Sequence, residues 1–152
     1  MLTSLRSVDS ITHFTQVENG QAHLILFAFY TMVIFGSMYY IIPRLLGREW
    51  LSAKFIQWHF WGSAYGIGML VFLLVVGGLN EGVAWNDPAD YKSAVDVTDS
   101  LLSFLRVSGI AWLMLIAANV VFAFHLLILL AGFGNKSGEP VSLAHEEEEL
   151  ES

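Results

Sequence analysis

The chain has 152 residues, of which 55% are hydrophobic and only 14% charged, with a net charge of −7 and no cysteine. Soluble domains carry about 25% charged residues, so this composition indicates a membrane protein. The lack of cysteine excludes disulfides, thiolate metal sites and covalent heme attachment through a C-x-x-C-H motif. Basic residues are few and scattered, which argues against nucleic-acid binding.

Three apolar stretches predict three membrane-spanning helices. A span needs about 20 mostly apolar residues, and the stretches 21–42, 55–79 and 101–133 supply them with Arg106 as their one charge. We therefore expect an all-α integral membrane protein. Its expected parts are a polar N-terminal tail (1–15), a three-helix membrane domain (16–134) and an acidic C-terminal tail (135–152).

The connections between the stretches predict the orientation. Arg44, Arg48 and Lys54 gather in the first connection, 43–54, whereas the second, 80–100, has five acidic residues and only Lys92. Basic connections stay in the cytoplasm. The N-terminus is therefore predicted outside and the C-terminus in the cytoplasm.

Proline, capping residues and glycine predict where the helices begin and end. Pro43 is expected to end the first helix, because proline blocks continuation of the helical hydrogen bonds. Thr98 or Asp99 is expected to cap the third helix. Gly132 and Gly134 suit its C-terminal end.

Small side chains recur along the second stretch. Small residues let membrane helices approach closely, so we expect this stretch to contact a partner, either a larger membrane subunit or copies of this chain. The residues are Gly62, Ser63, Ala64, Gly66, Gly68, Gly77 and Gly78.

Two motifs carry a resemblance to a known family. The first stretch opens with Gln21-Ala22-His23 and runs into YYIIPRLLGREW at 39–50, and WHFW follows at 58–61. Residues 14–130 thereby resemble the last three transmembrane helices of the catalytic subunit of heme-copper oxidases, most closely the cbb3 type and its nitric oxide reductase relatives. The resemblance implies a subunit of a respiratory electron-transfer complex in the bacterial inner membrane.

The resemblance also assigns roles to the start of the first helix. In that family a His-x-His pair serves two hemes, because residues two apart on a helix point to roughly opposite sides. Gln21 stands at the high-spin heme position, where an amide is a poor iron ligand, and His23 stands at the position of the axial ligand to a low-spin heme b. The resemblance implies that the chain binds no copper and cannot reduce oxygen alone.

Further residues are expected around that heme. Phe27, Tyr30 and Ile34 continue the face of His23 at helical spacing, and Phe27 and Tyr30 are candidates to line the porphyrin. Arg106 is predicted at a similar depth, and the resemblance implies that it holds heme propionates. In the alternative interpretation His23 hydrogen-bonds a neighbouring helix and Arg106 extends to the interface or pairs with Asp99. Asn119 is expected to hydrogen-bond between helices.

Two other histidines support a different hypothesis. His59 and His125 are predicted at depths that agree within one helical turn, so they form a candidate bis-histidine heme b site of a small cytochrome. The alternative is a packing role, with Trp58 and Trp61 in an aromatic belt. A third possibility is a structural or assembly subunit without a cofactor.

Overall fold

The computed structural model describes residues 6–87 and 93–133, and this part of the chain is built from helices. Three helical stretches are long and apolar enough to cross a membrane: Gln16–Leu46, Ala53–Asn86 and Ala94–Leu130. The predicted all-α membrane protein with three spans is confirmed. Its orientation across the membrane stays a prediction.

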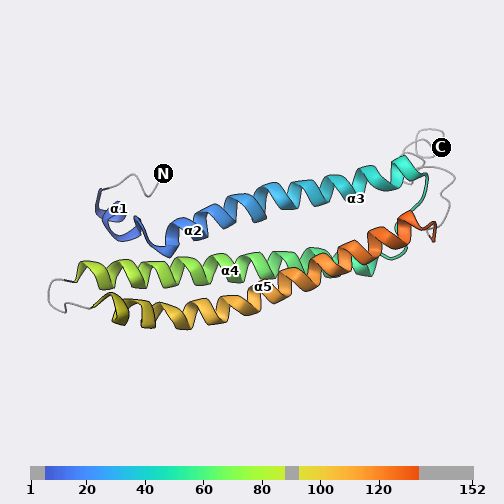
Figure 1. The fold of residues 1–152 in the computed structure, drawn as a ribbon. Coiled ribbons are helices and arrows are strands. Elements are labelled where there is room, and N and C mark those ends of the chain that lie inside the picture. Colours follow the sequence, from blue (N-terminus) through green and yellow to red (C-terminus); the bar gives the residue numbers. More distant parts are fainter. Residues whose placement is uncertain (1–5, 88–92, 134–152) are drawn as a thin grey trace, which may run out of the picture.

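The spans are arranged as an antiparallel pair with a third helix alongside it. The first span consists of α2 (Gln16–His23), the π-helical η2 (Leu24–Thr31) and α3 (Met32–Leu46). It is followed by α4 (Ala53–Asn86) and α5 (Ala94–Leu130), which pack along each other. The first span lies closest to α4 at α2, and α3 diverges from the pair (Figure 1).

The first span does not end at Pro43. The proline lies inside α3, which ends at Leu46 because Gly47 adopts the left-handed conformation (φ 60°) typical of a helix C-terminus. Proline has no N–H to offer the carbonyl four residues earlier, which is that of Tyr39. The Trp50 indole Nε1–H donates to this carbonyl at 2.9 Å. The carbonyl that Pro43 leaves without a helical partner is therefore satisfied, and the helix continues.

The second connection is shorter than predicted, because both flanking helices extend into it. Helix α5 begins at Ala94, not at Thr98 or Asp99, since Ser93 and Asp96 form a capping box. Gly132 (φ 89°) follows the end of α5 as expected. Gly134 and the acidic tail 135–152 lie outside the described residues.

Four small residues of α4, Gly62, Gly66, Gly77 and Gly78, face helices of the same chain, so the expectation that these four contact a partner was wrong. A β-carbon on Gly62 would lie 3.2 Å from that of Ala118, and one on Gly66 would lie 2.9 Å from the Leu115 side chain. Gly77 likewise faces Phe104 of α5, and Gly78 lies against the backbone of α2. Gly68 has nothing within 4 Å. These glycines therefore allow α4 to pack closely against α5 and α2 of the same chain.

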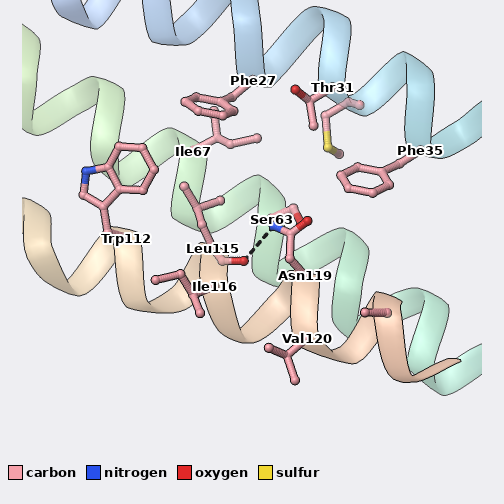
Figure 2. A pocket seen from close by; sticks show the side chains of 12 residues that line it. Phe27, Thr31, Phe35, Ser63, Ile67, Trp112, Leu115, Ile116, Asn119 and Val120 are labelled. Atoms are coloured by element: carbon pink, nitrogen blue, oxygen red, sulfur yellow. Dashed lines mark hydrogen bonds between the residues drawn. The ribbon is translucent and has the colours of Figure 1, made fainter. Parts of the chain in front are cut away.

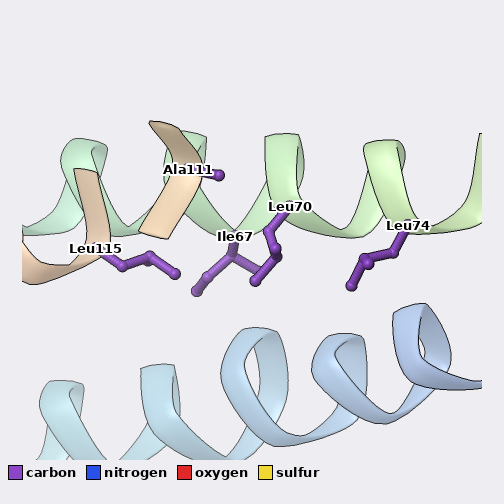
Figure 3. Close-up of a cluster of buried hydrophobic side chains, with 5 residues drawn as sticks. All are labelled: Ile67, Leu70, Leu74, Ala111 and Leu115. Atoms are coloured by element: carbon purple, nitrogen blue, oxygen red, sulfur yellow. The ribbon is translucent and has the colours of Figure 1, made fainter. Parts of the chain in front are cut away.

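The core forms where the three spans meet. Ile67, Leu70 and Leu74 of α4 and Ala111 and Leu115 of α5 are buried together (Figure 3). Phe27, Ala28 and Met32 of the first span pack against this cluster. Lipid is as apolar as these side chains, so close van der Waals packing rather than burial from water stabilises the contact.

The N-terminal segment, expected as a polar tail, contains a short helix. Helix α1 (Arg6–Thr12) packs across the C-terminal end of α4, where the Ile11 carbonyl lies directly over Gly82. The Asn86 side chain donates to the Ser10 carbonyl at 2.8 Å. These contacts fix the start of the first span, and with it His23.

Candidate cofactor-binding site

His23 is the last residue of α2, and one of its ring nitrogens is already engaged. Nδ1 lies 2.6 Å from the backbone carbonyl oxygen of Asn19. A carbonyl can only accept, so Nδ1 carries the hydrogen and the lone pair of the neutral ring lies on Nε2. A backbone hydrogen bond of this kind fixes the tautomer and orientation of metal-binding histidines.

Two aromatic rings flank the His23 imidazole. Phe27 lies one turn along the first span with its ring centroid 5.4 Å away, and Trp112 of α5 lies 5.8 Å away, edge to face. Phe27 and Trp112 also contact each other at 5.8 Å. His23 therefore lies where the first and third spans meet. Sequence reasoning missed Trp112, because the register of the third helix against the first was not available from the pattern.

Phe27 and Trp112 also begin a groove between the three spans (Figure 2). Its volume is about 470 Å³ and its lining is mostly apolar. Ser63 lines it with a buried hydroxyl that has no hydrogen-bond partner among the described residues. Asn119 also lines it and donates to the Leu115 carbonyl of its own helix at 2.8 Å, so it does not form the expected interhelical bond. The groove thus offers an apolar cavity with few polar groups.

The structure does not bring Tyr30 into this groove. Its side chain is exposed and packs on Phe29, whereas Thr31, Met32 and Phe35 follow Phe27 along the lining. The π-helical η2 explains this difference, because a π-helix bonds each residue to the fifth one back rather than the fourth. Residues at α-helical spacing from His23 therefore no longer lie on the same face as His23. Ile34 is exposed as well.

Arg106 and Gln21 lie in the same part of the bundle. Gly20 of α2 lies against Leu74 and Val75 of α4, and Gly77 of α4 lies against Phe104 of α5. Arg106, two residues after Phe104, therefore lies at about the depth of α2, as predicted. Its side chain is exposed, and no ion pair with Asp99 or another described acid is present. Gln21 is exposed.

His59 and His125 lie deep in the half of the α4–α5 pair next to the first connection, 43–54, which is called the inner half after its predicted cytoplasmic side. They are 1% and 0% exposed. His59 packs on Phe122, one turn from His125, so their depths agree within about one turn as predicted. His59 Nδ1 and the Tyr39 hydroxyl share a hydrogen bond of 3.0 Å, and the Ser52 backbone N–H donates to His125 Nε2 at 3.3 Å.

Ring contacts hold both histidines in place, and one ring nitrogen of each, His59 Nε2 and His125 Nδ1, has no hydrogen-bond partner among the described residues. Trp50 contacts the rings of Tyr39, Phe122 and His125, so the first connection folds against both histidines. A cavity beside His59 does not include His125, and the bis-histidine heme site stays a prediction. The two motifs YYIIPRLLGREW and WHFW therefore meet in space through Tyr39 and His59. Trp58 and Trp61 are exposed, as an aromatic belt requires.

Comparison with known proteins finds similarity along most of the chain. Residues 1–118 match the family of cytochrome c and quinol oxidase polypeptide I. A cytochrome c oxidase subunit 1 homolog of Agrobacterium tumefaciens is 25% identical over 90% of this chain and 26% of its own length. Cytochrome c oxidase subunit 1 of Rhodobacter capsulatus is 28% identical over 82% of this chain and 24% of its own length. The cbb3-type cytochrome c oxidase subunit CcoN1 of Stutzerimonas stutzeri is 23% identical over 84% of this chain and 27% of its own length. The chain spans about a quarter of the length of these relatives.

Proposed function

Because the chain belongs to the family of cytochrome c and quinol oxidase polypeptide I, we propose that it is a subunit of a respiratory electron-transfer complex that supplies one axial ligand, His23, to a low-spin heme b. It is a heme-copper oxidase-related protein of the bacterial inner membrane, with three membrane-spanning helices. The ligand, the cofactor and the complex are the proposal.

The observation that carries this proposal is the hydrogen bond of His23. Its Nδ1–H is held by the Asn19 carbonyl, which leaves Nε2 as the nitrogen that can donate to iron. A low-spin heme b would need a second ligand besides His23. Of the other described histidines, His13 pairs with Glu18, and His59 and His125 are buried near the first connection. The opposite ligand would therefore come from a partner.

The surroundings of His23 suit a large aromatic group. Phe27 and Trp112 present ring edges and faces next to the imidazole, and the apolar groove continues from them. Arg106 is the candidate to bind propionates, because its guanidinium is exposed at about the level of α2 and can hold a carboxylate through two hydrogen bonds. When bound, a heme b supplies one-electron transfer.

A partner would also have room on the surface of the first span. The central window of this span has no buried residue in the structure. A charged Arg106 and a heme edge are both unfavourable in lipid, so a neighbouring subunit would cover this side. A larger membrane subunit or further copies of the chain are the candidates.

The test is a reduced-minus-oxidised visible spectrum of the chain purified from its source membrane together with bound partners. We expect a heme b signal that is lost or becomes high-spin in His23→Ala and persists in His59→Ala and in Gln21→Ala, which changes an exposed residue of the same helix. Loss of heme in His59→Ala or His125→Ala with retention in His23→Ala would establish the small bis-histidine cytochrome instead. Absence of any heme from the complex would establish a structural subunit.

A further inference from the structure

A polar cavity lies at the C-terminal end of α4, where the N-terminal segment packs against it. Its volume is about 360 Å³. Two hydrogen bonds join its walls: the Asn86 side chain donates to the Ser10 carbonyl at 2.8 Å, and the Glu81 carboxylate accepts the Gln16 backbone N–H at 3.1 Å. The lining includes His13, Phe14, Thr15, Glu81, Trp85 and Asn86.

Three of the lining side chains keep an acceptor atom free after their contacts within the chain. Glu81 uses Oε2 to bind α2, which leaves Oε1. Asn86 donates from its amide nitrogen to two backbone carbonyls, which leaves Oδ1. His13 Nδ1 lies 3.0 Å from the Glu18 carboxylate and carries the hydrogen there, so the neutral ring has its lone pair on Nε2. None of these three acceptors has a hydrogen-bond partner among the described residues.

We propose that this cavity binds the ammonium group of phosphatidylethanolamine. A primary ammonium carries three donors, no acceptor and one positive charge. It therefore matches three free acceptors, one of which belongs to the negatively charged Glu81. Phe14 and Trp85 also line the cavity, and aromatic rings attract organic cations through their faces.

The position of the cavity along α4 makes a phospholipid the source of this ammonium. The apolar stretch 55–79 is long enough to cross the hydrocarbon core of a bilayer, and residues 81–86 follow it directly. Trp85 is 53% exposed, and exposed tryptophans gather at the level of the lipid head groups. The cavity therefore lies at the depth at which head groups surround the protein.

Two other ligands fit this cavity less well. A metal ion needs several strong ligands, and no group of three His, Cys, Asp or Glu side chains that could hold one occurs in the part of the chain that the structure describes. A head group without a cation, such as that of phosphatidylglycerol, would bring its phosphate toward Glu81 with nothing to offset the repulsion.

Native mass spectrometry of the full chain in mild detergent, with the partners that it retains, tests the proposal. The probes are phosphatidylethanolamine, its derivatives with one, two and three N-methyl groups, and phosphatidylglycerol, all with the same acyl chains. Each methyl group replaces one N–H and keeps the positive charge. We therefore expect retention to fall with every methyl group added and to be lowest for phosphatidylglycerol.

Two variants with matched controls test the residues. Glu81→Gln keeps an oxygen for the α2 backbone but removes the charge, and should lower the retention of phosphatidylethanolamine roughly ten-fold. Asp99→Asn is its control, because it removes an exposed acid of α5 outside the cavity lining. Trp85→Leu should lower retention about two- to five-fold, compared with Trp61→Leu, which removes an equally exposed tryptophan of the same helix. Circular dichroism checks that all four variants keep their helix content.

Four results would overturn the proposal. Equal retention along the methylated series would show that the acceptors do not bind the ammonium. Equal retention of phosphatidylglycerol would show that no ammonium is recognised. Losses of equal size in Glu81→Gln and Asp99→Asn would show only a general attraction of cations to this end of the bundle. Free ethanolamine that raises the melting temperature as much as phosphatidylethanolamine does would assign the cavity to a soluble amine.

Discussion

The contact between α2 and α4 can be tested at Gly78, where helix packing determines the position of His23. A β-carbon on Gly78 would lie 2.8 Å from the carbonyl carbon of Gln16 and 2.9 Å from Val17 Cγ2. Non-bonded carbons prefer about 3.5–4.0 Å, so Gly78→Ala must push α2 outward by roughly 0.7–1.2 Å. Overpacking of this size costs about 1–3 kcal/mol.

The matched control is Gly68→Ala, on the same helix with nothing within 4 Å. Both variants gain up to about 1 kcal/mol from the helix propensity of alanine, so this gain cancels in the comparison. We expect the free energy of unfolding of Gly78→Ala to lie about 1–3 kcal/mol below that of Gly68→Ala, as measured by circular dichroism during transfer from mild detergent to dodecyl sulfate. Free energies that agree within about 0.5 kcal/mol would refute the close packing of α2 on α4.

Three further predictions concern the hydrogen bond between Tyr39 and His59, the start of α5 and the topology. Tyr39→Phe removes the partner of His59 Nδ1 and should lower the free energy of unfolding by about 1–3 kcal/mol, whereas Tyr40→Phe, whose exposed side chain contacts Arg44 through its ring, should change it little; equal effects would contradict the role of this bond. Ser93→Ala removes the capping box of α5 and should cost about 0.5–2 kcal/mol in the same unfolding assay, compared with Ser103→Ala inside the helix; an equal or smaller loss than in the control would argue against the cap. Because the chain has no cysteine, a single cysteine at Ser93 should react with an impermeant reagent from outside, and one at Lys54 only after permeabilisation; the reverse pattern would invert the topology.

Hydropathy was sufficient to predict the three spans but not their ends. An apolar run of membrane length leaves few alternatives to a helix. Helix ends depend on single hydrogen bonds: Trp50 supports the carbonyl that Pro43 leaves unbonded, and Ser93 caps α5. Trp50 lies outside the run that defines the first span, so its effect on Pro43 could not be read from that run.

The candidate site was predictable only in part. His23 follows from the resemblance, and its depth and that of Arg106 follow from counting residues. Trp112 depends on how α5 lies against the first span, which periodicity does not specify. Tyr30 was expected beside His23 because α-helical spacing was assumed, and the π-helical η2 changes that spacing. Likewise, the glycines of α4 predicted close packing but not which helix would provide it.

The contact between His23 and Trp112 has a consequence for biogenesis. The chain is synthesised from the N-terminus, so the first span enters the bilayer while α5 has yet to be made. That span is apolar enough to be stable there by itself, but the aromatic wall beside His23 is complete only after the third span has inserted and docked. A group that needs both sides of this wall can therefore be loaded only at the end of membrane insertion, and truncation before Trp112 would leave a stable membrane helix whose histidine has lost that neighbour.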